Sequence, residues 1–183
     1  MERKEGLAKY FWRVTYAHTI AYFIAGIFAV VFMDYDGLWA LPYFSFMRPL
    51  DSPVIALGPV FQILRGFLYA LVFLPLRKQL FGKKYGLAKL GLLLFGLTYL
   101  LTFGPGIGSF EGYIYTVIPV RYQMRGIPEM LLWLLLFVAI LHVSAKYAHK
   151  KIVTVMSAVI MVLIVLMGIA GFASMHQTVA AAF

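Results

Sequence analysis

Residues 60 to 73, VFQILRGFLYALVF, place one arginine in the middle of an otherwise apolar segment. Gln62 lies three residues before Arg65 and Tyr69 four residues after it, so the three side chains share one face of a helix. An arginine at the centre of a membrane span costs about 2.5 to 3.5 kcal/mol and is rarely kept without a use. Because a guanidinium suits a carboxylate or a phosphate, the pattern predicts an anion-binding or gating position that faces the interior of a helix bundle.

The alternative for Arg65 is a structural one, in which a carboxylate or broken-helix carbonyls neutralise its charge. The leading candidate partner is Glu111, in the segment GPGIGSFEGYIYT, whose glycines and proline allow the chain to turn into a bundle. Alternatively, Glu111 is a solvated loop carboxylate. Charged residues at the starts of the second and fourth predicted spans form a second polar layer, read first as salt bridges and helix-end charges and second as a mouth that attracts anions. The predicted ligand-binding residues are Arg65, Gln62, Glu111, Tyr69, Arg48, Arg121 and Arg125.

Two histidines raise a different possibility. His18 and His142 lie at similar depth in two predicted helices, and two such histidines can be the axial ligands of a b-type haem. A lone histidine inside a membrane more often hydrogen-bonds a neighbouring helix. We expect no other cofactor, and the sequence predicts no metal site.

Enzymatic motifs are missing from the chain. It contains no HExxH zinc motif, no GxSxG elbow and no cysteine, which excludes thiol chemistry. An enzyme on this scaffold would be one that modifies lipids at the outer leaflet, with Glu111, Arg121 or Tyr113 as its polar groups.

The elements that position these residues follow from composition. Of the 183 residues, 63% are hydrophobic and 13% charged, and the mean hydropathy is +0.89. These values lie far from those of soluble domains, which are roughly a quarter charged. The sequence predicts an all-α integral membrane protein with one membrane domain, residues 1–183.

Long apolar runs predict five membrane-spanning helices. Each must supply about 20 residues to cross a hydrocarbon core of about 30 Å. The predicted spans cover residues 10–33, 53–76, 87–103, 128–145 and 152–172.

The positive charges predict the orientation of these spans. Twelve of the sixteen lysines and arginines lie in the N-terminal tail, the 77–89 loop and the 146–151 loop; three lie in the opposite loops, and Arg65 is the last. Cytoplasmic loops retain such cations, so we expect the N-terminus inside, the C-terminus outside and location in the cytoplasmic membrane. The net charge of +9 is thereby explained without nucleic acid as a partner.

The two predicted outer loops, residues 34–51 and 104–126, are rich in Trp, Tyr and Phe. Aromatic side chains of this kind settle at the membrane interface. We expect the two loops to form a cap folded over the bundle.

The sequence as a whole favours a small membrane protein that binds, and permeates, a small anionic or zwitterionic solute or a lipid headgroup in a polar pocket around Arg65. Membrane lipids and further copies of the chain, or a larger membrane complex, are the expected partners. The alternatives are an accessory subunit, an outer-leaflet lipid-modifying enzyme and a b-haem protein that uses His18 and His142.

Overall fold

The computed structural model describes residues 6–81, 83–102 and 104–181, in which helices alternate with turns and loops and no β-strand is formed. Helices make up 79% of these described residues. Three helical stretches are long and apolar enough to cross a membrane: Leu7–Phe32, Val120–Lys146 and Lys151–Gln177. The prediction of an all-helical architecture with apolar spans is confirmed to this extent.

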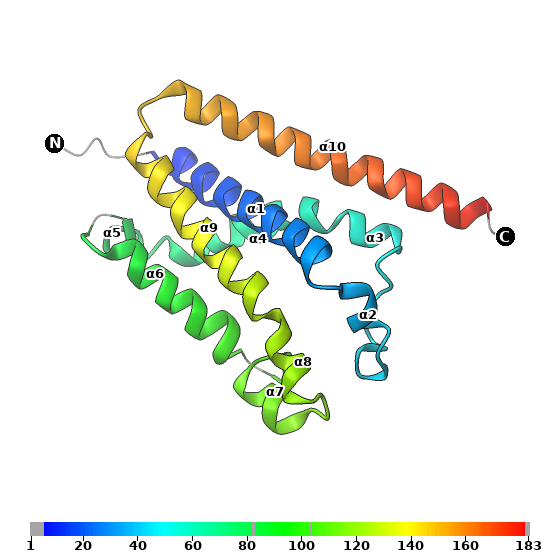
Figure 1. The fold of residues 1–183 in the computed structure, drawn as a ribbon. Coiled ribbons are helices and arrows are strands. Elements are labelled where there is room, and N and C mark those ends of the chain that lie inside the picture. Colours follow the sequence, from blue (N-terminus) through cyan, green and yellow to red (C-terminus); the bar gives the residue numbers. More distant parts are fainter. Residues whose placement is uncertain (1–5, 82, 103, 182–183) are drawn as a thin grey trace.

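Helix α1 (Leu7–Phe32) lies at the centre of the bundle (Figure 1). All residues from Arg13 to Thr19 are buried, because α4 (Gly58–Phe73) and α9 (Ile127–Lys146) both pack on α1. Gly66 of α4 allows a close approach: a Cβ there would lie 2.8 Å from the carbonyl oxygen of Thr15. Small residues let helix backbones pack closely in membranes, and α1 contributes four buried alanines at intervals of four residues, Ala17, Ala21, Ala25 and Ala29.

The second predicted span is divided into two helices. Short α3 (Pro53–Ala56) ends at Ala56, and α4 begins at Gly58 and ends at Phe73 rather than at residue 76. Proline 59 explains the division, because it has no N–H to continue the hydrogen-bond ladder of α3.

The last helix, α10 (Lys151–Ala181), packs on α3, α4 and α1 along one face. Gly168 of α10 lies so close to α3 that an added Cβ would be 3.1 Å from the carbonyl oxygen of Ala56. At the other end of the contact, the Trp12 indole donates a hydrogen bond of 3.1 Å to the Ser157 hydroxyl. Most of the remaining surface of α10 is exposed and apolar.

The third predicted span consists of α6 (Gly86–Phe95) and a π-helical turn, Gly96–Leu100, preceded by short α5 (Arg77–Phe81). It ends at Leu100, whereas the prediction extended it to residue 103, which lies outside the described residues. Fifteen residues span about 22 Å, and the sixteen of α4 about 24 Å. Both helices are therefore shorter than the roughly 30 Å of a hydrocarbon core.

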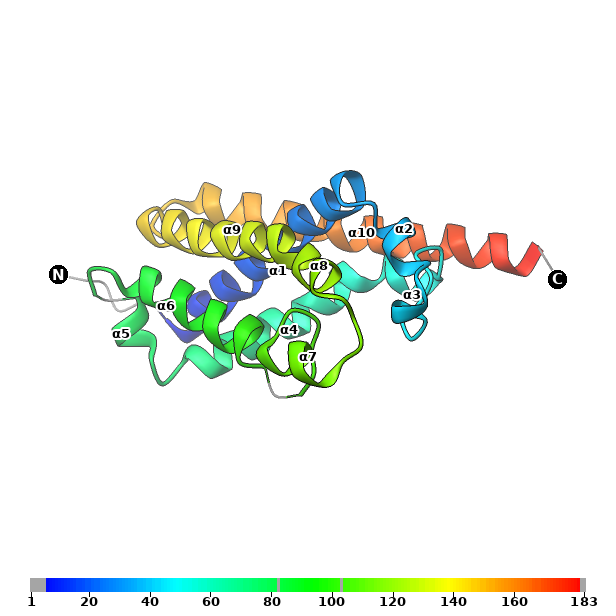
Figure 2. The same cartoon turned by 60° about the horizontal axis from the view of Figure 1, so that its bottom comes forward.

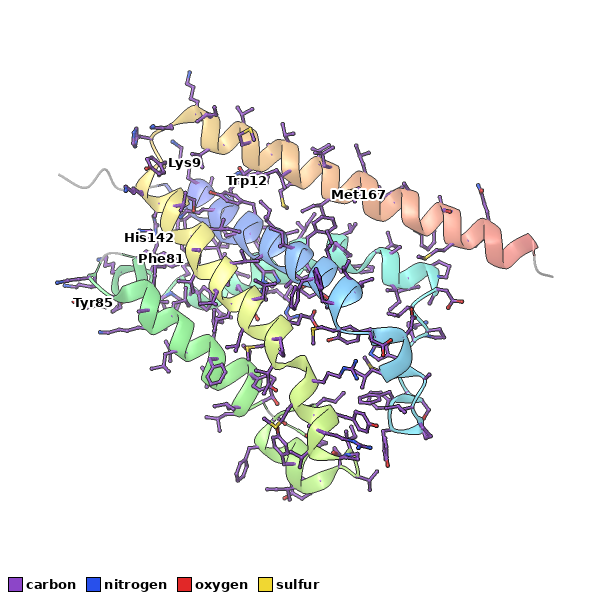
Figure 3. The ribbon with its side chains drawn as sticks, viewed as in Figure 1. Lys9, Trp12, Phe81, Tyr85, His142 and Met167 are labelled. Carbon is purple, nitrogen blue, oxygen red and sulfur yellow. The ribbon has the colours of Figure 1, made fainter. Side chains whose placement is uncertain are left out.

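One end of the molecule holds three segments in both views: the start of α1, the short helix α5, and the connection between α9 and α10 (Figures 1 and 2). Lys9, Tyr85 and His142 are found toward this end (Figure 3). Helices α2 (Tyr35–Trp39), α7 (Phe110–Tyr115) and α8 (Val120–Gln123) lie toward the other. The described parts of the basic segments predicted to share a side thus lie at the same end of the fold.

The two aromatic-rich segments pack against each other and are called the cap here, residues 34–52 and 104–126. Leu38 and Phe44 of one segment and Ile118 of the other form a second hydrophobic cluster, separate from the main core. Short 3₁₀ turns, Pro42–Phe44 and Met124–Gly126, complete the segments. The side chain of Gln123, 1% exposed, accepts a hydrogen bond from the amide of Gly108 and donates to three oxygens of the same loop.

Candidate functional site

The candidate site begins with a histidine buried in the bundle. His18 of α1 is 0% exposed. The Trp133 indole of α9 donates a hydrogen bond of 3.2 Å to Nδ1 of His18. Nε2 of His18 lies 3.0 Å from Oε1 of Gln62 on α4. An indole N–H can only donate, so Nδ1 accepts and Nε2 carries the proton that it donates to Gln62. One neutral tautomer of His18 therefore joins three helices.

Aromatic rings enclose this histidine. The ring of Tyr69 lies 4.9 Å from that of His18, centroid to centroid, and those of Phe137 and Trp133 lie at 5.5 and 5.6 Å. The contacts of Gln62 and Tyr69 with His18 place these two predicted site residues toward α1. We call His18, Gln62, Tyr69, Trp133 and Phe137 the His18 cluster.

Arg65 differs from the prediction in its direction. It lies at the edge of the buried face of α4 and is exposed, because Gln62, Gly66 and Tyr69 occupy the side toward α1. Its guanidinium carbon lies 5.8 Å from the centroid of the Tyr69 ring. Within the described part of the chain it forms no hydrogen bond and no ion pair. Arg65 is thus a cation beside the His18 cluster with no fixed anion.

Glu111, the predicted partner of Arg65, belongs to α7 in the cap and forms no ion pair among the described residues. Arg48 is exposed in the cap, and Arg121 is exposed with its guanidinium 4.7 Å from the centre of the Tyr122 ring. The predicted ligand-binding residues therefore divide into two groups, one at the His18 cluster and one in the cap.

Arg125 has a defined structural task. Its guanidinium donates hydrogen bonds of 2.8 and 3.2 Å to the carbonyl oxygen of Met33, at the end of α1, and lies 3.6 Å from the Asp34 carboxylate. A helix end leaves such carbonyls without partners, so this arginine connects the second cap segment to α1. The first reading of the outer charges, as salt bridges and helix-end contacts, describes Arg125.

A second polar pair was not predicted as part of the site. The hydroxyl of Tyr35 donates a hydrogen bond to the carboxylate of Glu129, and the two residues are 94 positions apart in the sequence. Burial raises the pKa of the Tyr35 phenol, and the hydrogen bond to Glu129 raises it further. Glu129 is four residues before Trp133 and eight before Phe137, and that spacing was the available signal that it lies on the inner face of α9. Nothing in the sequence indicated Tyr35 as its partner.

The two candidate haem ligands, His18 and His142, lie in different surroundings. Both ring nitrogens of His18 are already hydrogen-bonded within its cluster, whereas His142 is exposed near the far end of α9 (Figure 3). In the described ranges no three His, Cys, Asp or Glu side chains are grouped as a metal ion would require.

The fold and these contacts define an all-helical protein with helices suited to a membrane. Comparison with protein-family models, with curated proteins and with solved structures finds no match to the chain.

Proposed function

We propose that the protein crosses the membrane five times, with its N-terminus in the cytoplasm, and binds a small anionic or zwitterionic solute or a lipid headgroup at Arg65. Three helical stretches are each long and apolar enough to cross a membrane. The two shorter apolar helices run between the same two ends of the fold. The short helix α3 precedes α4 and adds to the length of this apolar segment. Positive charge concentrated in the segments at one end supports a cytoplasmic side there.

The observation that carries the proposal is the free guanidinium of Arg65 halfway along the segment from Pro53 to Arg77. A charge at that depth is costly, and no carboxylate of the described chain offsets the cost for Arg65. The exposed side of the arginine is open to an external group. Phosphate and carboxylate oxygens match the planar donors of arginine in two-point contacts.

Permeation is the second part of the proposal. A solute held midway between the two ends of the bundle has equal distances to travel to either side. One copy of a five-helix chain encloses little space, so we propose that the pathway forms between copies. The exposed position of Arg65 also suits an accessory subunit, in which a partner's carboxylate meets the arginine.

Thermal stability of the purified protein in detergent tests the binding proposal. Wild type and Arg65→Gln are compared against a panel of inorganic anions, amino acids and lipids. A ligand at 100 times its dissociation constant stabilises a protein by about 2.7 kcal/mol. We expect at least one anionic or zwitterionic compound to raise the Tm of wild type and not that of Arg65→Gln.

Two further variants make the result specific. Arg65→Lys keeps the charge but loses the planar fork, so we expect an intermediate response. Arg121→Gln removes an exposed arginine that stacks on Tyr122 in the cap, and we expect the wild-type response. If no compound distinguishes wild type from Arg65→Gln, and the protein purifies with a stoichiometric partner, the accessory-subunit alternative replaces the binding proposal.

A further inference from the structure

A cavity of about 540 Å³ lies beside the outer half of α1, between that helix, the first cap segment and the start of α3 and α4. Its walls are mostly apolar and include Ile27 and Val30 of α1, Ile55 of α3 and Pro59 of α4. Cavities of 300 to 1,000 Å³ are the usual size for small-molecule sites. Arg65 does not line this cavity, which makes it a separate site from the one proposed above.

The polar groups of the cavity come from three elements. Tyr22 of α1, Tyr35 of α2 and Glu129 of α9 contribute a phenol, a second phenol and a carboxylate, and the indole of Trp39 adds a further aromatic surface. The rest of the lining is apolar. The cavity therefore combines mostly apolar walls with a few aromatic and acidic groups.

Only one of the two carboxylate oxygens of Glu129 takes part in a hydrogen bond among the described residues. Its Oε2 accepts the hydrogen bond from Tyr35, and Oε1 has no hydrogen-bond partner in the described part of the chain. The nearest cation along the helix, Arg125, is instead engaged by Met33 and Asp34. No ion pair to Glu129 is formed by the residues that the structure describes. Glu129 thus lines the cavity with one carboxylate oxygen unpaired and no ion-pair partner among the described residues.

This combination points to a particular kind of ligand. A carboxylate beside aromatic rings recognises ammonium groups, by charge-assisted hydrogen bonds or by attraction of the cation to the ring faces. Aliphatic walls on α1 and α3 suit an alkyl chain, which gains about 0.8 kcal/mol for each buried methylene group. An anionic headgroup would meet repulsion from Glu129, and a neutral one would leave its charge uncompensated.

We propose that this outer cavity binds an amphiphile with an ammonium headgroup, the ammonium on Oε1 of Glu129 and the alkyl chain between α1 and α3. Two sources share this chemistry, an aminolipid of the membrane and a free alkylamine. The site has the opposite charge preference to Arg65.

Binding of decyltrimethylammonium, below its micelle concentration, to protein in an uncharged detergent tests this proposal. Decanol serves as the neutral ligand with the same chain, and tetramethylammonium as the headgroup alone. A hydrogen bond or contact to a charged group is worth about a tenfold change in affinity. We expect wild type to bind decyltrimethylammonium about tenfold more tightly than decanol, and tetramethylammonium only weakly.

Three variants locate the binding. Glu129→Gln keeps an oxygen for the Tyr35 hydroxyl but loses the charge, so we expect it to bind decyltrimethylammonium and decanol equally. Asp36→Asn makes the same chemical change at an exposed carboxylate of α2 and should behave as wild type. Gly26→Leu adds a side chain to the cavity wall, where a Cβ meets no atom within 4 Å, and should weaken binding of both alkyl ligands.

The proposal is overturned if Glu129→Gln retains the preference for the ammonium ligand, or if wild type has none. If Glu129→Gln does not fold, Gly26→Leu decides: unchanged binding of decyltrimethylammonium in this variant overturns the proposal. Given binding at the cavity, nanodiscs distinguish the source of the natural ligand. Competition by phosphatidylethanolamine but not by phosphatidylglycerol identifies an aminolipid, and its absence identifies a free amine.

Discussion

The polar groups of the His18 cluster and those of Arg65 and Glu129 lie within the same helical bundle but differ in how they are satisfied. His18 has a partner for each ring nitrogen and is completely enclosed. Arg65 has no anion, and Glu129 has one oxygen without a partner among the described residues. Polar groups whose hydrogen bonds are all made within the protein stabilise the fold, whereas polar groups that lack a hydrogen-bond or ion-pair partner are available to a ligand.

This difference assigns separate tasks to residues that are close in sequence. Gln62 and Arg65 are three positions apart on α4, yet one connects α4 to α1 and the other faces outward. Substitutions in the closed cluster are expected to reduce stability, and substitutions at the open groups to change binding.

The largest effect is expected for His18→Ala. The change leaves a cavity between α1, α4 and α9 and removes the partners of Gln62 and Trp133, at a cost of about 2 to 5 kcal/mol in the free energy of unfolding. Thermal or denaturant unfolding in detergent measures it. His142→Ala, at an exposed position of α9, is the matched control and should change stability by less than about 0.5 kcal/mol. Equal effects of the two substitutions would contradict a structural role for the cluster.

A smaller loss is expected for Gly66→Ala, at the contact between α4 and α1. The new Cβ would lie 2.8 Å from the oxygen and 2.9 Å from the Cα of Thr15, and both atoms belong to a helix backbone that cannot move alone. Overpacking of this kind costs about 1 to 3 kcal/mol. Gly96→Ala adds the same group where no atom lies within 4 Å. Unfolding of the two variants side by side checks the prediction, which fails if both are equally stable.

Arg65→Gln should hardly change stability when no ligand is present. The arginine forms no ion pair or hydrogen bond within the described chain, so its removal breaks none, and we expect a change within about 0.5 kcal/mol. The same unfolding assay measures it. A loss as large as that for His18→Ala would show that Arg65 belongs to the closed cluster, and the comparison between the two regions would no longer hold.

The smallest effect concerns Tyr35 and pH. Because the pKa of Tyr35 is raised above its ordinary value of 10.0 in the folded protein, the folded state retains a proton that the unfolded state loses. This contribution to stability is complete below pH 10 and is lost as the pH rises through the folded-state pKa. In Tyr35→Phe, the decline of Tm above pH 10 should be shallower. Tyr115→Phe, at an exposed tyrosine, should decline as wild type does.

Hydropathy alone predicted the first, fourth and fifth long helices with ends close to those of α1, α9 and the start of α10. At the second and third, the structure has apolar helices that are shorter than predicted. Pro59 divides one segment, and a π-helical turn at Gly96–Leu100 alters the end of the other. The proline could be recognised in the sequence as a helix-breaking residue.

Helical spacing correctly grouped Gln62 with Tyr69, because residues three and four apart share a face. It also placed Arg65 on this face. Arg65 lies at the edge of the face and stays exposed, whereas Gln62 and Tyr69 contact His18. The partners of these residues, His18 and Trp133, lie 44 and more positions away in sequence. Their contacts depend on the register of three packed helices, which a single sequence does not specify.

The central claim, that Arg65 lies inside the membrane within a crossing helix, is most directly tested by the sidedness of α4. The chain has no cysteine, so single cysteines at Phe46, Lys84 and Val117, all exposed positions, can be labelled with a membrane-impermeant maleimide in intact cells. We predict labelling of the cysteines at Phe46 and Val117 from outside, and of that at Lys84 only after the membrane is opened. Labelling of the cysteines at Phe46 and Lys84 from the same side would mean that α4 does not cross, and would contradict an intramembrane anion site at Arg65.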